Sequence, residues 1–72
     1  MSTLNKLPDG SNAPEYKCVA YCEVLDETKT VTLIEWWYEG KKVQPIEQSA
    51  KEYFYEAFDK SPFKIKSVEE VE

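Results

Sequence analysis

Apolar and polar residues along the first half of the chain predict two long strands. Residues 16–25 and 30–38 are rich in β-branched and aromatic side chains and contain neither Gly nor Pro, which is typical of strands. The polar residues 26–29 between them fit a hairpin loop of about four residues. Neither strand shows the strict alternation expected when one face of a sheet is in water. Both faces of the predicted sheet therefore carry apolar side chains.

A short third strand and a helix follow in the second half. Residues 39–42 predict a tight turn around a glycine, and residues 43–44 predict a short strand that ends at Pro45. Apolar positions then recur with the spacing of a helix that packs on a sheet. These positions are Ala50, Tyr53, Phe54, Ala57 and Phe58.

The ends of the helix have sequence signals of their own. Ser49 and Glu52 fit a capping box, although a start as early as Ile46 also fits the pattern. Ser61-Pro62 predicts the end of the helix, because the residue before a proline disfavours the helical conformation. Residues 63–68 predict a final strand.

The order strand, strand, short strand, helix, strand predicts a small α+β fold. We expect an antiparallel sheet of three to four strands with the one helix packed on one face. Residues 1–14 contain a dense turn signal and no periodic pattern, so we expect a flexible N-terminal arm before a single domain at residues 15–72. The domain is expected to end in a short acidic tail of Glu69, Glu70 and Glu72.

The aromatic residues exceed what one helix can bury. Neighbouring residues of Trp36-Trp37-Tyr38 leave a strand on opposite faces. We expect Trp37 to join the core under Phe54 and Phe58. The other face would then form an apolar surface of the size that marks interaction sites. Its candidate partner-binding residues are Tyr21, Ile34, Trp36 and Tyr38.

A second candidate surface lies on the helix. Glu52, Glu56 and Asp59 project opposite the apolar positions, with Tyr55 at the boundary. An acidic face that contains a tyrosine can dock a basic partner, since tyrosine is enriched in protein contacts. The alternative is a solvated helix face whose charges serve solubility.

Charge and composition exclude several chemistries. The net charge is −5, and all nine basic residues are lysines, with no Arg or His. The chain thus lacks an imidazole group for acid–base catalysis or metal binding. We therefore expect that it is not an enzyme and that it binds no cofactor and no metal. Four lysines near aromatic residues could form a platform that binds single-stranded nucleic acid: Lys41, Lys42, Lys64 and Lys66. The net negative charge disfavours such binding. The nine lysines also offset the carboxylates that a DNA mimic would need.

The two cysteines are predicted to be free. Four residues apart on a strand, Cys18 and Cys22 would lie about 13 Å from each other on one face. A disulfide requires Cα atoms within about 7 Å. We expect no disulfide and two thiols used as small apolar residues.

Two features bear on localisation. No apolar stretch approaches the ~20 residues needed to span a membrane, so we expect no membrane partner. Residues 1–14 lack a basic segment followed by an apolar one, which predicts no signal peptide. We therefore expect a cytoplasmic protein, in the host cytoplasm if a virus encodes it.

The layout of residues 15–71 is similar to that of small acidic accessory proteins encoded by phages and plasmids. The resemblance is one of size, acidity and architecture, and several such proteins bind and inhibit a host enzyme or defence complex. It implies a small cytosolic binding module that inhibits or modulates a partner protein of unknown identity. The alternative is a homodimer with a structural or assembly role, in which the open sheet faces pack together.

Overall fold

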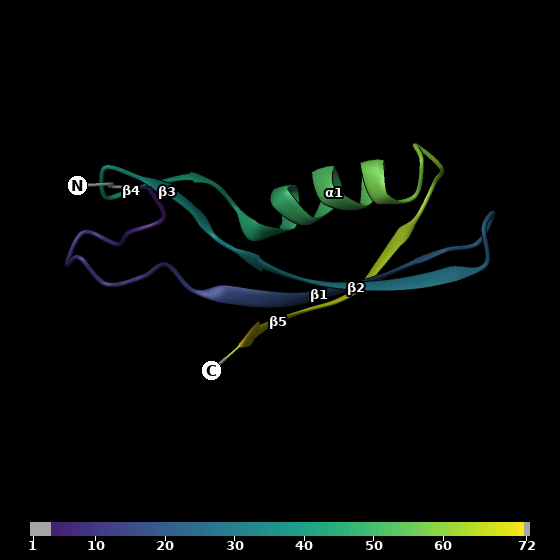
Figure 1. The fold of residues 1–72 in the computed structure, drawn as a ribbon, viewed down its shortest axis with the longest axis horizontal. Coiled ribbons are helices and arrows are strands. Elements are labelled where there is room, and N and C mark those ends of the chain that lie inside the picture. Colours follow the sequence, from purple (N-terminus) through teal and green to yellow (C-terminus); the bar gives the residue numbers. More distant parts are fainter. Residues whose placement is uncertain (1–3, 72) are drawn as a thin grey trace.

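The computed structural model describes residues 4–71 and shows a three-stranded sheet, a two-stranded sheet and one helix (Figure 1). This confirms the predicted small α+β fold. The order is β-β-β-β-α-β because the predicted second strand is divided into two. The elements are β1 (Glu15–Cys22), β2 (Glu27–Ile34), β3 (Trp36–Tyr38), β4 (Lys41–Gln44), α1 (Ile46–Ala57) and β5 (Lys64–Val71).

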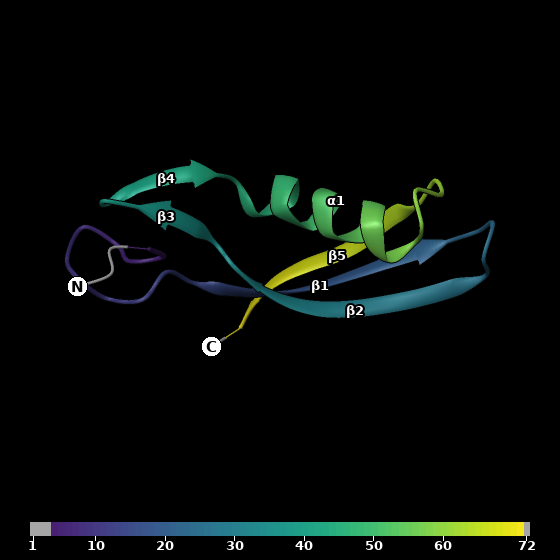
Figure 2. The same ribbon diagram turned by 45° about the horizontal axis from the view of Figure 1, so that its top comes forward.

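The larger sheet has the strand order β2-β1-β5, and both neighbouring pairs are antiparallel. The helix lies across one face of this sheet, and the β3–β4 hairpin extends beyond one end of it (Figure 2). The helix α1 packs mainly on β1 and β2. Strand β5 lies at an edge of the sheet, and the helix covers it less completely.

Small residues on β1 make room for large ones on α1. Cys18, Ala20 and Cys22 are fully buried on the covered face, under the fully buried rings of Phe54 and Phe58. The two rings are stacked with centroids 5.7 Å apart. Both cysteines are free thiols, placed in the core as the strand pattern predicted.

Phe63 completes the aromatic part of the core. Its ring centroid lies 6.0 Å from that of Phe54 and 5.8 Å from that of Phe58. The predicted helical stripe is confirmed at Ala50, but Tyr53 is 42% exposed and lies at its margin.

The helix begins at the earlier of the two predicted positions. Its N-cap is Pro45, which has no side-chain capping bond, so the predicted capping box is wrong. The hydroxyl of Ser49 and the carboxylate of Glu52 instead accept hydrogen bonds from Nε2 of Gln44, at 2.8 and 3.1 Å. The two residues thus tie the end of β4 to the first turns of α1.

The helix ends at Ala57, before the predicted Ser61. The amide of Lys60 donates to the carbonyl of Tyr55 and that of Asp59 to the carbonyl of Glu56, at 2.7 and 3.1 Å. This is the bond pattern of a Schellman motif. Asp59 stands at its left-handed position with φ of 52°. A local backbone motif, rather than the following proline, terminates the helix.

Several strand boundaries differ from those predicted, and β2 and β4 begin earlier, at Glu27 and Lys41. Strand β1 ends at Cys22, and residues 23–26 form the turn, where Asp26 has φ of 51° and accepts a 2.9 Å hydrogen bond from the Tyr21 hydroxyl. Strand β5 continues to Val71. Glu69 and Glu70 therefore belong to the sheet and not to a tail, whereas Glu72 lies outside the described residues.

The predicted second strand breaks at Glu35. The amide of Glu35 donates to the carbonyl of Pro14 at 2.9 Å. Because Pro14 has no N–H, it cannot return a ladder bond, and pairing between β1 and β2 stops beside it. The chain then enters β3, which pairs with β4. Trp37 consequently lies in the hairpin and not under Phe54 and Phe58, so that prediction is wrong.

The segment before β1 lies along β3. The amide of Asn5 donates to the carbonyl of Trp37 at 2.6 Å, and the Asn5 side chain accepts from the Trp37 amide at 3.2 Å. Leu4 forms a bridge with Tyr38. The predicted flexibility of residues 1–14 stays a prediction, and residues 1–3 lie outside the described part. Residues 4–14 do not cover the open face of the larger sheet (Figure 1).

Candidate protein-binding surfaces

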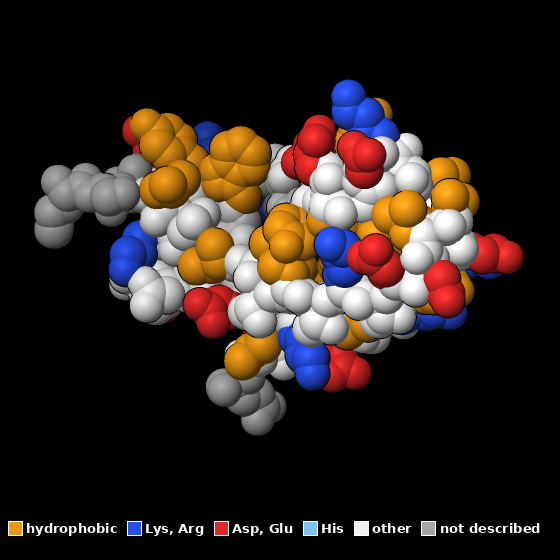
Figure 3. Space-filling view, turned by 45° about the vertical axis from the view of Figure 1, so that its right-hand side comes forward, with side chains coloured by type: hydrophobic (Ala, Val, Ile, Leu, Met, Phe, Trp, Pro, Cys, Tyr) orange, Lys and Arg blue, Asp and Glu red, His pale blue; other side chains and the backbone are white. Residues whose placement is uncertain are grey.

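Four large apolar side chains are exposed on and beside the β3–β4 hairpin. Each is between 43% and 52% exposed, and together we call them the hairpin patch: Leu4, Trp36, Tyr38 and Val43. Figure 3 shows hydrophobic side chains gathered at the hairpin end of the molecule. Trp36 and Tyr38 share one side of β3, as the period of two along a strand predicted.

A buried carboxylate lies at the base of the hairpin. Glu35 is only 5% exposed, and its Oε1 accepts a 2.7 Å hydrogen bond from Nε1 of Trp37. Its Oε2 lies 3.4 Å from Nζ of Lys42 on β4. The Lys42 ammonium also lies 6.0 Å from the centre of the Trp37 ring. Because these three residues bond to one another, β3 and β4 are held in one orientation.

A two-residue turn closes the hairpin. Glu39 and Gly40 both have positive φ, 51° and 74°, which is the conformation of a type I′ turn. A Cβ on Gly40 would lie 3.5 Å from Cα of Pro8. The turn therefore also packs against the segment that precedes β1.

The open face of the larger sheet is more polar than predicted. Register places Val19, Tyr21, Ile34 and Val71 there among lysine, threonine, serine and glutamate residues. Trp36 and Tyr38, expected on the same face, lie on the separate hairpin, because the chain leaves the sheet at Glu35. The predicted continuous aromatic face is therefore divided between the larger sheet and the hairpin.

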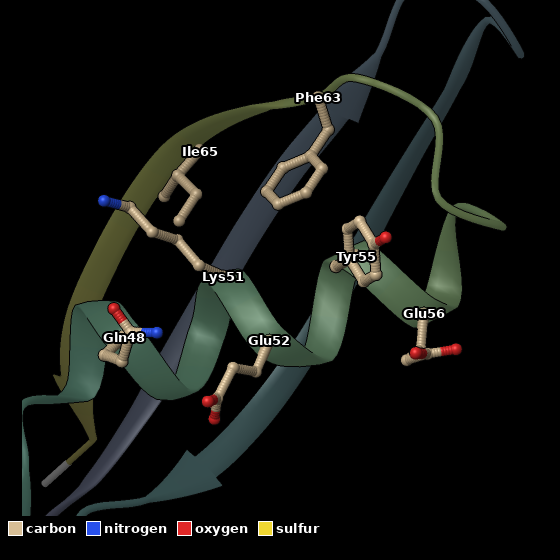
Figure 4. A pocket seen from close by; sticks show the side chains of 7 residues that line it. All are labelled: Gln48, Lys51, Glu52, Tyr55, Glu56, Phe63 and Ile65. Atoms are coloured by element: carbon tan, nitrogen blue, oxygen red, sulfur yellow. The ribbon is translucent and has the colours of Figure 1, made fainter.

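A groove of about 690 Å³ runs between α1 and β5. Figure 4 shows Phe63 and Ile65 projecting on the β5 side and Lys51 and Tyr55 on the facing side of the helix. The groove exists because α1 packs on β1 and β2 and leaves the β5 side of the sheet partly uncovered. Its complete lining is Gln48, Lys51, Glu52, Tyr55, Glu56, Phe63 and Ile65.

The groove brings together three of the four predicted helix residues. Glu52, Tyr55 and Glu56 line it, whereas Asp59 does not and instead ends the helix. Among the described residues, neither glutamate makes an ion pair within 4 Å. The acidic charge on this rim is thus left for solvent or a partner.

Sequence reasoning missed Phe63 and Ile65 as surface residues. The period of two in the final strand was a signal that they share one face. Their exposure depends on the lateral position of the helix, which no local pattern specifies. Val43 was missed because its strand is short, and Leu4 because it lies in the predicted arm.

The lysines considered for nucleic-acid binding fall into two groups. Lys64 and Lys66 line a second hollow of about 440 Å³ beside Tyr21, and the Lys66 ammonium lies 5.7 Å from the centre of that ring. Lys42 is at the hairpin, next to the Glu35 carboxylate, and Lys41 is its neighbour on β4. The four lysines thus do not form one continuous platform.

Burial also governs the ionisation of the core thiol. It raises the pKa of Cys18, and the negative charge of Glu47 adds to the effect. A raised pKa favours the unreactive thiol over the thiolate nucleophile. In the part of the chain that the structure describes, no group of three or more Cys, Asp or Glu side chains is placed to hold a metal ion.

The single helix of residues 4–71 has twelve residues, and it is too short and too polar to cross a membrane. Comparisons with protein-family models, with curated proteins and with solved structures found no match.

Proposed function

We propose that this chain is a small protein-binding module that uses the hairpin patch to engage a partner protein and thereby inhibits or modulates it. The observation that carries the proposal is the exposure of Trp36 and Tyr38, side by side on a hairpin that projects from the domain. Tryptophan and tyrosine are the residues most enriched among energetically dominant contacts in protein interfaces.

The hairpin is held before any partner arrives. Glu35, Trp37 and Lys42 fix its base, and the bonds between Asn5 and Trp37 fix its other side. A hairpin backbone that is already ordered loses little conformational entropy on binding, so more of the contact energy appears as affinity. A cytoplasmic role and an origin in a phage or plasmid belong to the same proposal, and they rest on the resemblance in size and acidity.

The test is capture of a partner by the immobilised full chain from an extract of the cells that produce it. We expect a stoichiometric protein partner to be retained by the wild type and lost by the double variant W36A/Y38A. The control is Y53A/Y55A, which removes two exposed aromatic rings from the helix instead. Circular dichroism checks that both variants fold.

Two results would reject the proposal. One is the absence of any stoichiometric partner for the wild type. The other is a partner that binds the hairpin variant as tightly as it binds the wild type. A partner lost only by the helix control would transfer the binding site to the groove between α1 and β5.

A further inference from the structure

Among the described residues, no strand pairs with the outer edge of β5. This strand lies at the end of the order β2-β1-β5 and pairs with β1 on its inner side. It is eight residues long and contains no proline. An edge of this kind exposes a row of N–H and C=O groups that can pair with another strand. The groove beside α1 leaves space above this edge for the side chains of an added strand.

The charges on β5 are ordered along its length. Lys64 and Lys66 occupy the first half, and Glu69 and Glu70 occupy the second. None of the four forms an ion pair within 4 Å in the described part of the chain. A strand that reads basic and then acidic is complementary to itself when the two copies run antiparallel, and self-repelling when they run parallel in register.

We propose that β5 is a self-association strand that pairs antiparallel with β5 of a second copy, near Val68, to form a continuous six-stranded sheet. The occupant of the edge is a second copy because this pairing places the lysine half of each strand beside the glutamate half of the other. The contact uses the same residues on both copies, so it closes as a two-fold dimer and does not grow into a fibre.

The grooves support the same arrangement. Pairing at β5 with both helices on one side places the second copy's strand beside each α1–β5 groove. Ile65, which lines the groove and is partly exposed in one copy, then lies beside the end of the second copy's β5. Removing its apolar surface from water adds a favourable term that surface ion pairs alone would not supply.

A bulge makes the edge selective. Between Val19 and Ala20 of β1 the register of β5 shifts, so that Lys66 is an extra residue. Bulges and edge lysines usually prevent indiscriminate strand pairing. A strand that presents a carboxylate opposite a lysine removes the charge part of this barrier, and pairing near Val68 places Glu70 of one copy opposite Lys66 of the other.

The test measures the mass of the full chain by sedimentation velocity across a micromolar concentration series. We expect the mass to rise from 8.4 kDa toward twice that value, with weaker association at high salt. The variants K64E/K66E and E69K/E70K should each weaken the dimer about tenfold or more. Mixing the two variants in equal amounts should restore a dimer of wild-type affinity.

The control is K41E/K60E, which makes the same change in net charge away from β5 and should dimerise like the wild type. The variant W36A/Y38A should also dimerise, so this proposal and the proposed function fail separately. Hydrogen exchange of the wild type supplies a readout without mutation: amides of residues 64–71 should become more protected as concentration rises.

The proposal is overturned by a wild type that stays monomeric throughout the series. It is equally overturned by a dimer that neither charge variant weakens, by mixed variants that do not associate, or by a mass that doubles while exchange in residues 64–71 stays unchanged.

Discussion

The indole of Trp37 donates a 2.7 Å hydrogen bond from Nε1 to Oε1 of Glu35, the buried carboxylate at which the chain leaves the larger sheet. A buried charge is costly unless it is paired and hydrogen-bonded. Here the pairing comes from the indole and from Lys42. The bond thus links the break in the strand to the orientation of the hairpin that carries Trp36 and Tyr38.

Replacing Glu35 should loosen the hairpin and lower stability. In Glu35→Ala the indole N–H and the ammonium of Lys42 both lose their acceptor, and we expect the free energy of unfolding to fall by about 1–3 kcal/mol. In Glu35→Gln the side-chain oxygen can still accept from Trp37, so the loss should be smaller. Urea unfolding followed by tryptophan fluorescence measures both.

The matched control for this experiment is Glu56→Ala, which removes an exposed glutamate of the helix. It should change the free energy of unfolding by less than about 0.5 kcal/mol. Equal unfolding midpoints for Glu35→Ala and Glu56→Ala would show that the buried contact contributes nothing to stability.

The core should depend on Phe54 far more than on its exposed neighbour. Phe54 is fully buried between α1 and the small residues of β1, whereas Tyr55 is 49% exposed. Phe54→Ala should cost about 3–5 kcal/mol, enough to unfold much of a domain of this size. Tyr55→Ala should cost less than about 1 kcal/mol. Thermal unfolding by circular dichroism distinguishes them, and comparable melting temperatures would contradict the described core.

Local periodicity predicted the features that depend on local sequence. The spacing of Ala50, Phe54 and Phe58 identified the buried side of the helix, and the alternation along residues 36–38 placed Trp36 and Tyr38 together. The break at Glu35 was not predictable in this way. It depends on Pro14, which lies about twenty residues earlier and meets Glu35 only in the folded chain.

In the candidate surfaces, too, some features depend on local sequence and others on the whole fold. Tyr55, Glu52 and Glu56 were predicted to share a helix surface, and they line the groove. The groove itself requires that α1 lie over β1 and β2, which is a property of the whole core. Asp59 was predicted at a binding surface from its position on a helical wheel, but the Schellman motif had already ended the helix there.

Stability should fall at alkaline pH because of Cys18. Burial raises the pKa of its thiol in the folded state, so the unfolded chain releases this proton at lower pH. The contribution is complete below the unfolded thiol pKa of about 8.5 and is lost as the pH rises through the folded value. Urea unfolding between pH 7 and 10 should show a steeper fall for the wild type than for Cys18→Ala. Parallel profiles would show that the thiol does not couple to folding.

One substitution in the hairpin turn should stabilise the protein. Glu39 adopts φ of 51° at the first central position of a type I′ turn, with Gly40 at the second. Asparagine tolerates this left-handed conformation better than glutamate, and Asn-Gly is the preferred pair for such turns. Glu39→Asn should therefore raise the free energy of unfolding by about 0.5–1 kcal/mol. Gly40→Ala is the opposing change and should lower the free energy of unfolding, because alanine is strained at φ of 74°. Urea midpoints that shift in the same direction for both variants would contradict the assigned turn.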